Sequence, residues 1–112
     1  EPVTLKTTHK PVVALPYNFE LHDIAMMALQ NHPSDELYRR SIDAFECLYA
    51  ESAVRAKFMS IDVHSFLSGQ PHRIKHVYRP FEDILPNPGA RRWRGDIGLP
   101  LRRIICRRAR DA

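Results

Sequence analysis

The run from Phe58 to Ile74 constrains the fold more than any other part of this 112-residue chain. Its first residues, Phe58 to Val63, are mostly apolar and partly β-branched, which predicts a short buried strand. His64 ends this run, and Ser, Gly, Gln and Pro residues follow before a helical period begins around Pro71. A strand, a loop and a helix form the βα unit of an α/β fold, where functional residues lie at the carboxyl ends of strands. His64 is therefore the first candidate for a functional residue.

A second buried strand is predicted at residues 12–15, which Pro11 precedes and Pro16 ends. The loop that follows, from Tyr17 to Asp23, gathers aromatic, amide and ionisable side chains. One interpretation is a solvated loop in which Tyr17 covers the core. The other is that Pro16 and Tyr17 line a substrate groove.

Three helical segments are expected. Residues 24–29 fit a helical turn, and Ser34 fits the N-cap of a longer helix, with acidic residues in its first turn. Apolar residues at helical spacing form two stripes, which indicate packing against a sheet: Tyr38, Ile42, Phe45, Leu48 and Tyr49, then Ile74, Val77, Tyr78, Phe81, Ile84 and Leu85. Pro80 lies inside the second stripe, which predicts a bend or break near Arg79.

Three motifs resemble those of one enzyme family. Met59-Ser60-Ile61-x-x-His64 with Ser68-Gly69-x-Pro71-His72-Arg73-Ile74 is similar to the last catalytic motif of polysaccharide deacetylase-like proteins, the NodB-homology superfamily. The similarity is greatest to the allantoinase-like and peptidoglycan-deacetylase-like branch. Leu15-Pro16-Tyr17-x-x-Glu20-Leu21-x-Asp23-Ile24 and Phe45-x-x-Leu48-Tyr49-x-Glu51 match in the same register. The resemblance runs from about Val12 to Leu85.

This resemblance implies an α/β fold, a partial (β/α) barrel of the polysaccharide deacetylase type. Residues 1–85 would form the C-terminal part of such a domain, and residues 86–112 an Arg-rich tail that is disordered or translated out of the ancestral frame. It also implies a hydrolase acting on non-peptide carbon–nitrogen bonds. The substrate would be an N-acetyl sugar, peptidoglycan or a ureide.

Six residues receive roles through the resemblance. His64 matches the general acid that protonates the leaving amine, a task suited to the ordinary pKa range of histidine. The alternative for His64 is a strand-end histidine that bonds only to backbone. The predicted substrate-binding residues are Pro16, Tyr17, Asp23, Pro71 and Arg73. The family commonly has Asn at the position of His22, so no role is assigned to that residue.

The complete family domain uses a divalent metal, typically zinc, held by an Asp and a His-x-x-x-His pair from its N-terminal half. This chain has no Asp-Asp pair after a strand. His72 and His76 have the spacing but belong to the helix of the last motif, where Arg73 and Lys75 disfavour a cation. We therefore predict no metal ligands and no cofactor in this chain, which would be inactive alone and would associate with itself or with a missing N-terminal half.

Charge divides the chain in two. Residues 1–85 hold 9 Lys and Arg against 11 Asp and Glu, whereas residues 86–112 hold 8 Arg against 2 Asp. This tail supports a competing function, a non-catalytic module that binds nucleic acid or anionic surfaces. A solvated tail is the simpler interpretation, and nucleic acid is not among the expected partners. No membrane span is expected because no apolar run nears about 18 residues. Two cysteines and no signal peptide favour the cytoplasm.

Overall fold

The computed structural model describes residues 3–9, 11–15, 18–93 and 103–106. Along the chain, these residues form β1 (Val3–Leu5), β2 (Val12–Ala14), η1 (Ile24–Leu29), α1 (Glu36–Glu51), β3 (Lys57–Ser60), α2 (Ser65–Ser68), α3 (Lys75–Ile84), β4 (Ala90–Trp93) and β5 (Arg103–Cys106). The predicted strands at 12–15 and 58–63 are present in shorter form. Both long helices are also present.

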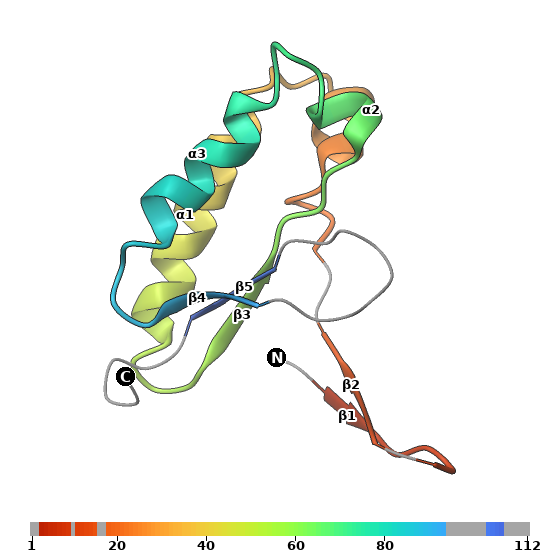
Figure 1. Ribbon diagram of the computed structural model, residues 1–112, viewed down its shortest axis with the longest axis vertical. Coiled ribbons are helices and arrows are strands. Elements are labelled where there is room, and N and C mark those ends of the chain that lie inside the picture. Colours follow the sequence, from red (N-terminus) through yellow and green to blue (C-terminus); the bar gives the residue numbers. More distant parts are fainter. Residues whose placement is uncertain (1–2, 10, 16–17, 94–102, 107–112) are drawn as a thin grey trace.

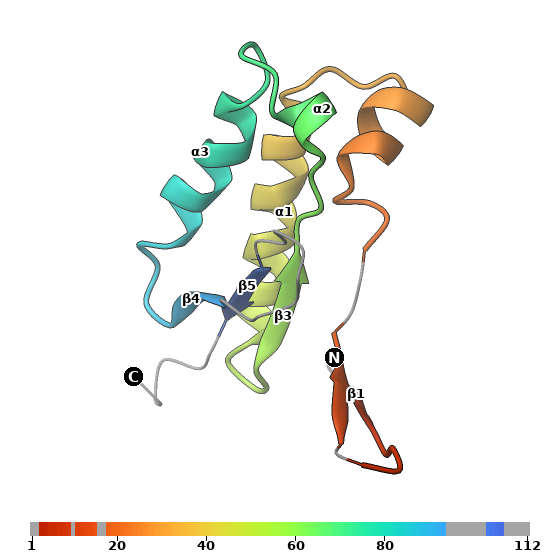
Figure 2. The same cartoon turned by 45° about the vertical axis from the view of Figure 1, so that its right-hand side comes forward.

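The described strands form two small sheets. β1 and β2 pair as an antiparallel hairpin, while β3, β5 and β4 form a second antiparallel sheet in that order. Figures 1 and 2 show the hairpin projecting away from the helices. The described part of the tail thus includes β4 and β5, and both belong to the sheet of β3. A parallel barrel remains a prediction.

The core lies where α1 and α3 pack together over β3. The two helices run side by side in both views (Figures 1 and 2). Leu37 of α1, Met59 of β3 and Ile84 of α3 are almost completely buried in one apolar cluster. The rest of that cluster comprises Leu21, Met26, Phe45, Ile61, Val77 and Phe81. Each large side chain in such a cluster contributes about 1.5–3 kcal/mol by leaving water.

Three local expectations differ from the structure. α3 passes through Pro80, which is almost completely buried, without the expected break, and a bend there stays a prediction. The same helix begins at Lys75 rather than Pro71, because residues 71–74 form a turn. α1 has Asp35, not Ser34, at its N-cap, and the Ser34 hydroxyl instead accepts a hydrogen bond from Arg73. The short helix α2, directly after His64, was not predicted.

The segment 24–29 is helical as expected, but its turn is wider than that of an α-helix. The amide of Gln30 donates to the carbonyl of Ala25, five residues earlier, at 3.0 Å. Asn31 then has a φ of 55°, a left-handed conformation that Asn tolerates and that ends the helix. Wide helical turns of this kind occur often at functional sites.

Candidate functional site

Two segments far apart in sequence meet at the start of η1. The amide of Asp23 donates to the carbonyl of Asp62 at 3.1 Å, and the amide of Asp62 donates to the carbonyl of Leu21 at 2.9 Å. These bonds form a short parallel bridge between residues 22 and 62. The bridge brings the end of the 18–23 loop beside the end of the 57–63 segment. Asp23 therefore lies against His64, and α2 lies beside η1 (Figures 1 and 2).

Asp23 is fully buried, and its carboxylate accepts four hydrogen bonds. Oδ1 accepts from the Ile24 amide and from Nδ1 of His64, both at 2.8 Å. Oδ2 accepts from the His64 amide and from the Ser68 hydroxyl, both at 2.7 Å. A carboxylate offers about four lone-pair sites. All of them are used, so the carboxylate fixes η1, His64 and α2 with respect to one another.

The bond to Asp23 defines the state of the His64 ring. Because a carboxylate oxygen can only accept, Nδ1 of His64 carries a hydrogen and Nε2 is the nitrogen left for proton exchange. The His64 side chain is 40% exposed, while the Asp23 side chain is 0% exposed. In this arrangement a buried carboxylate orients the ring of a partly exposed histidine. The alternative interpretation, in which His64 bonds only to backbone, is therefore wrong, because its ring bonds to the side chain of Asp23.

A small cavity adjoins His64. It has a volume of about 210 Å³ and is lined by Val63, His64, Ser65, Ser68, Gly69, Ile74, Val77 and Tyr78. Its walls come from the loop after β3, from α2 and from α3. Cavities for drug-sized ligands have volumes of about 300–1,000 Å³. This one is therefore smaller than a typical cavity for a drug-sized ligand.

The predicted substrate-binding residues do not line the cavity beside His64 in the part of the chain that the structure describes. Pro16 and Tyr17 lie outside the described residues. Pro71 is exposed in the turn before α3, and Arg73 is half-buried with Nε 3.2 Å from the Ser34 hydroxyl. Neither is among the residues that line the cavity beside His64. Asp23 is at the site, but it holds His64 rather than facing the cavity.

Two contributors, Ser68 and His22, received no role from the sequence, and Asp23 received a different one. Asp23 was predicted to bind substrate, whereas the structure shows its carboxylate bonded to His64. Ser68 matched a motif position without a role. His22, whose ring centroid is 5.1 Å from that of His64, had none either. The motif match at 15–24 was the available signal for Asp23, since Asp23 is one of its matched residues.

The metal ligands that the resemblance implies for a complete domain are not matched by His72 and His76. His72 is exposed in the turn, whereas His76 is buried on α3. Burial, aided by the nearby charges of Lys75 and Arg79, lowers the pKa of His76, and Asp35 partly opposes this. Within the described ranges, one set of His, Cys, Asp and Glu side chains has a geometry that could hold a metal: His22, Asp23 and His64.

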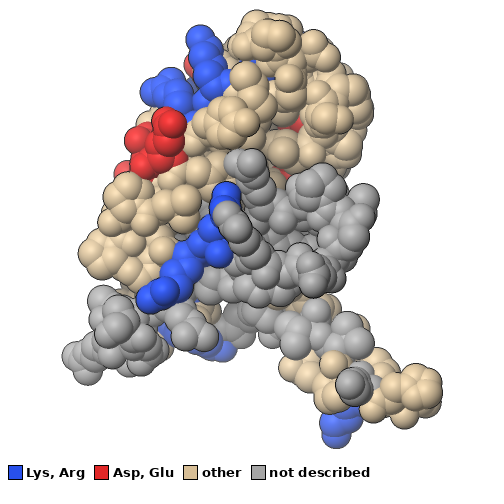
Figure 3. Space-filling view, viewed as in Figure 1, with Lys and Arg blue, Asp and Glu red and all other residues tan. Residues whose placement is uncertain are grey.

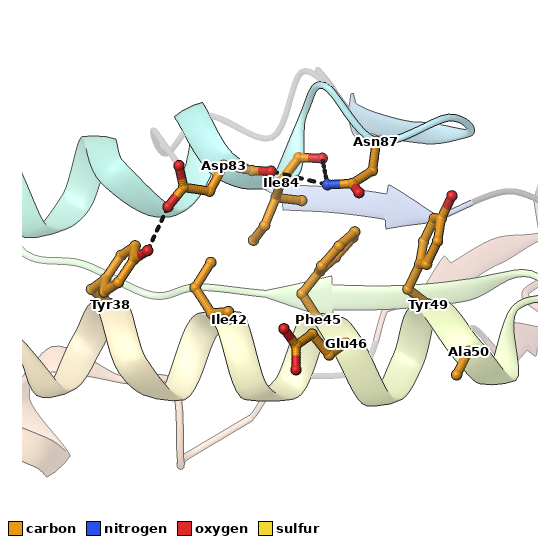
Figure 4. Close-up of a pocket in the computed structure, with 9 residues that line it drawn as sticks. All are labelled: Tyr38, Ile42, Phe45, Glu46, Tyr49, Ala50, Asp83, Ile84 and Asn87. Atoms are coloured by element: carbon orange, nitrogen blue, oxygen red, sulfur yellow. Dashed lines mark hydrogen bonds between the residues drawn. The ribbon is translucent and has the colours of Figure 1, made fainter.

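A larger hollow of about 400 Å³ lies between α1 and the end of α3 (Figure 4). The Tyr38 hydroxyl donates to Asp83 across it, and this bond raises the pKa of Tyr38. Asn87 caps α3 by donating to the carbonyls of Asp83 and Ile84. The hollow shares no lining residue with the cavity at His64. The hydrogen bonds around this hollow thus join α1 to α3 and cap the end of α3.

The tail presents few basic side chains within the described residues. Figure 3 shows Lys and Arg side chains over β4 and, beside acidic ones, over the helices. Arg91 and Arg92 are neighbours on β4, so their side chains point to opposite faces of the strand. They do not converge on one phosphate-binding face. The remaining Arg side chains of the tail lie outside the description.

None of the helices in the described part of the chain has the length and apolar run that a membrane crossing requires.

Comparison with known proteins gives one curated relative. The chain is 32% identical over 82 residues to a putative polysaccharide deacetylase of Schizosaccharomyces pombe. The match covers 71% of this chain but only 26% of the relative, so the chain spans about a quarter of that protein. No family model matches the chain, and no solved structure matches it. The chain is thus similar, over most of its length, to one segment of a polysaccharide deacetylase-like protein.

Proposed function

We propose that this chain is the C-terminal part of a polysaccharide deacetylase-like hydrolase and supplies the proton donor for cleavage of a non-peptide carbon–nitrogen bond. The observation that carries this proposal is the bond between Asp23 and His64. The likeness to a putative polysaccharide deacetylase supports the same reaction class. The family resemblance had already assigned the general acid to His64.

The proposed chemistry depends on the His64 ring, the Asp23 carboxylate and the cavity beside them. When an amide bond breaks, the leaving nitrogen must gain a proton, and an imidazolium gives one up near neutral pH. Nδ1 of His64 donates to Asp23, whose negative charge stabilises the imidazolium and fixes the ring plane. Nε2 then delivers the proton. The adjacent cavity accommodates the acyl group of the substrate.

The rest of the reaction requires groups beyond those of this site. In a complete domain of this family, a bound divalent cation would polarise the amide carbonyl and activate a water. By the resemblance, its ligands would lie in the N-terminal half of that domain. The isolated chain therefore binds an amide weakly and does not hydrolyse it.

Ligand titration followed by NMR tests this proposal. Oligomers of N-acetylglucosamine are added to the isotope-labelled chain, and the ring carbon–hydrogen signals of its histidines are recorded. We expect the His64 signal to shift, and the signal of His9, exposed beside β1, to stay. Fully deacetylated glucosamine oligomers are the matched control, because they lack the acyl group. Allantoin and peptidoglycan fragments then define the preferred amide.

Two results would contradict the proposal. One is a His64 signal that no N-acetylated or ureide ligand shifts. The other is release of acetate by the purified chain in the presence of zinc, at equal rates in the wild type and in His64→Gln. That second result would place the catalytic proton donor elsewhere.

A further inference from the structure

Two histidines and an aspartate converge where η1 begins. One ring nitrogen of His22, one of His64 and a carboxylate oxygen of Asp23 all lie within 4.8 Å of one another. Nδ1 of His64 is 2.8 Å from Oδ1 of Asp23, and Nδ1 of His22 is 3.9 Å from the same oxygen. Ligand atoms of a tetrahedral zinc ion lie about 3.3 Å apart, given bonds of about 2.0–2.1 Å. The two separations bracket this value.

The backbone holds the three residues in place. The backbone amide of Asp23 donates to the carbonyl of Asp62, and the backbone amide of His64 donates to the carboxylate of Asp23. These backbone bonds bring the three side chains together without an ion.

The surroundings suit a partly open metal site. The Asp23 side chain is 0% exposed, that of His22 is 12% exposed, and that of His64 is 40% exposed. One side is thus buried while the other reaches solvent, which leaves room for a water or another ligand. The rings of Phe19 and Phe66 lie against His22 and His64, with centroids 6.1 and 5.7 Å away. Both rings are themselves exposed, at 54% and 65%, so they form part of the solvent-facing rim of the site.

We propose that His22, Asp23 and His64 bind a divalent transition metal of the zinc class. The ion binds between Nδ1 of His64 and the Asp23 carboxylate, and the neutral ring changes tautomer so that its one hydrogen is on Nε2. A ring nitrogen of His22 completes the set. Two imidazoles and one carboxylate favour Zn²⁺, Ni²⁺ or Cu²⁺. Mg²⁺ and Ca²⁺ prefer oxygen ligands and are not expected to bind.

This set differs from the metal ligands that the resemblance implies for a complete domain. Those include a His-x-x-x-His pair, whereas His22 and His64 are 42 residues apart in sequence and meet through the parallel bridge. The consequence goes beyond the proposed function. A ring bound to metal through Nδ1 cannot take up a second proton there, so the metal-bound chain lacks the imidazolium that acts as the proton donor. The site would be inhibitory.

Zinc titration of the chain without an affinity tag tests this inference. Competition with a chromogenic chelator near neutral pH gives the affinity and the stoichiometry. We expect one zinc per chain, and a loss of affinity of about tenfold or more in His22→Asn and in His64→Gln. His72→Gln is the matched control, because His72 is exposed and lies outside the cluster. Mg²⁺ should not compete.

A second measurement covers variants that fail to fold. Zinc added to the wild-type chain should shift the ring signals of His22 and His64 in NMR spectra and leave that of His72 in place. Zinc affinity that is unchanged in both cluster variants, or that falls in His72→Gln instead, would overturn the proposal. So would zinc binding that shifts the ring signals of other histidines alone.

Discussion

At the scale of single residues, Asp23 links function to folding. Its carboxylate is buried and accepts from two backbone amides and two side chains. Removing an acceptor from such a network leaves a buried donor without a partner, which costs more than the bond itself contributes. The residue that orients His64 is thus also one that the local fold requires.

Asp23→Asn tests this double role. The new amide nitrogen cannot accept, so at least one of the four donors is left without an acceptor. We expect the free energy of unfolding to fall by about 1.5–3 kcal/mol, the contribution of one hydrogen bond to a charged group. Urea denaturation near neutral pH measures it. Asp43→Asn, the same change on the exposed face of α1, should have no comparable effect. Equal effects of the two substitutions would contradict the account.

His76 gives the protein a pH dependence. Burial lowers its pKa below the ordinary value of 6.5, so the folded protein binds this proton less readily than the unfolded chain. The contribution to stability is fully present above pH 6.5 and is lost as the pH falls through the lowered pKa. We expect His76→Gln to lose less stability than the wild type between neutral pH and pH about 5.

Urea denaturation at the two pH values measures this difference. His72→Gln, a change at an exposed histidine four residues earlier, should keep the pH dependence of the wild type. A His76→Gln variant with an unchanged pH dependence would show that another group is responsible.

At the scale of elements, the packing of α1 against α3 and β3 determines stability. Leu37 of α1 is 0% exposed, whereas Leu29 at the end of η1 is 66% exposed. Leu37→Ala removes buried methyl groups and leaves a cavity, so we expect a loss of about 2–5 kcal/mol. Leu29→Ala, the same change at the surface, should stay within about 0.5 kcal/mol. Similar melting temperatures for the two variants would mean that the core lies elsewhere.

The sequence predicted these elements unevenly. Helical periodicity identified α1 and most of α3 because each buries one continuous apolar stripe. Pro80 was misjudged because the pattern shows its missing amide but not the packing of its ring, which the core accepts. The start of α3 was misplaced since Pro71 suits a turn as well as a first helical position. α2 is too short to show a period.

The sequence named both His64 and Asp23 but not the contact between them, since Asp23 was predicted to bind substrate. His64 stood out as a polar residue at the end of an apolar run, and the family motif gave it a role. Its partner Asp23 is 41 residues away in sequence, and only the parallel bridge between 22 and 62 brings them together. Such contacts depend on tertiary structure. A single sequence does not reveal them through local patterns.

At the scale of the whole molecule, the described residues leave apolar surface in contact with solvent. Val3 and Leu5 of the hairpin are 55% and 51% exposed, and Phe66 beside His64 is 65% exposed. Among the described strands, β3 pairs with β5 along one edge and has no strand beside its other edge. Exposed apolar side chains and strand edges favour association.

We therefore expect the chain to associate with itself, or with the remaining part of a longer domain. Light scattering after size-exclusion chromatography should give a mass above that of one chain. Leu5→Ser, which makes the hairpin more polar, should reduce the associated fraction. A single-chain mass up to the solubility limit, unaffected by this substitution, would contradict the expectation.

The central claim is that Asp23 holds His64 as a proton donor. The ¹⁵N chemical shifts of the His64 ring test it most directly, because they report which nitrogen carries the hydrogen. The account predicts that, in the neutral ring, Nδ1 is protonated and Nε2 is not, and that Asp23→Asn changes this distribution. A wild-type ring protonated at Nε2, or one with the mixture of forms seen for a solvent-exposed histidine, would contradict the claim.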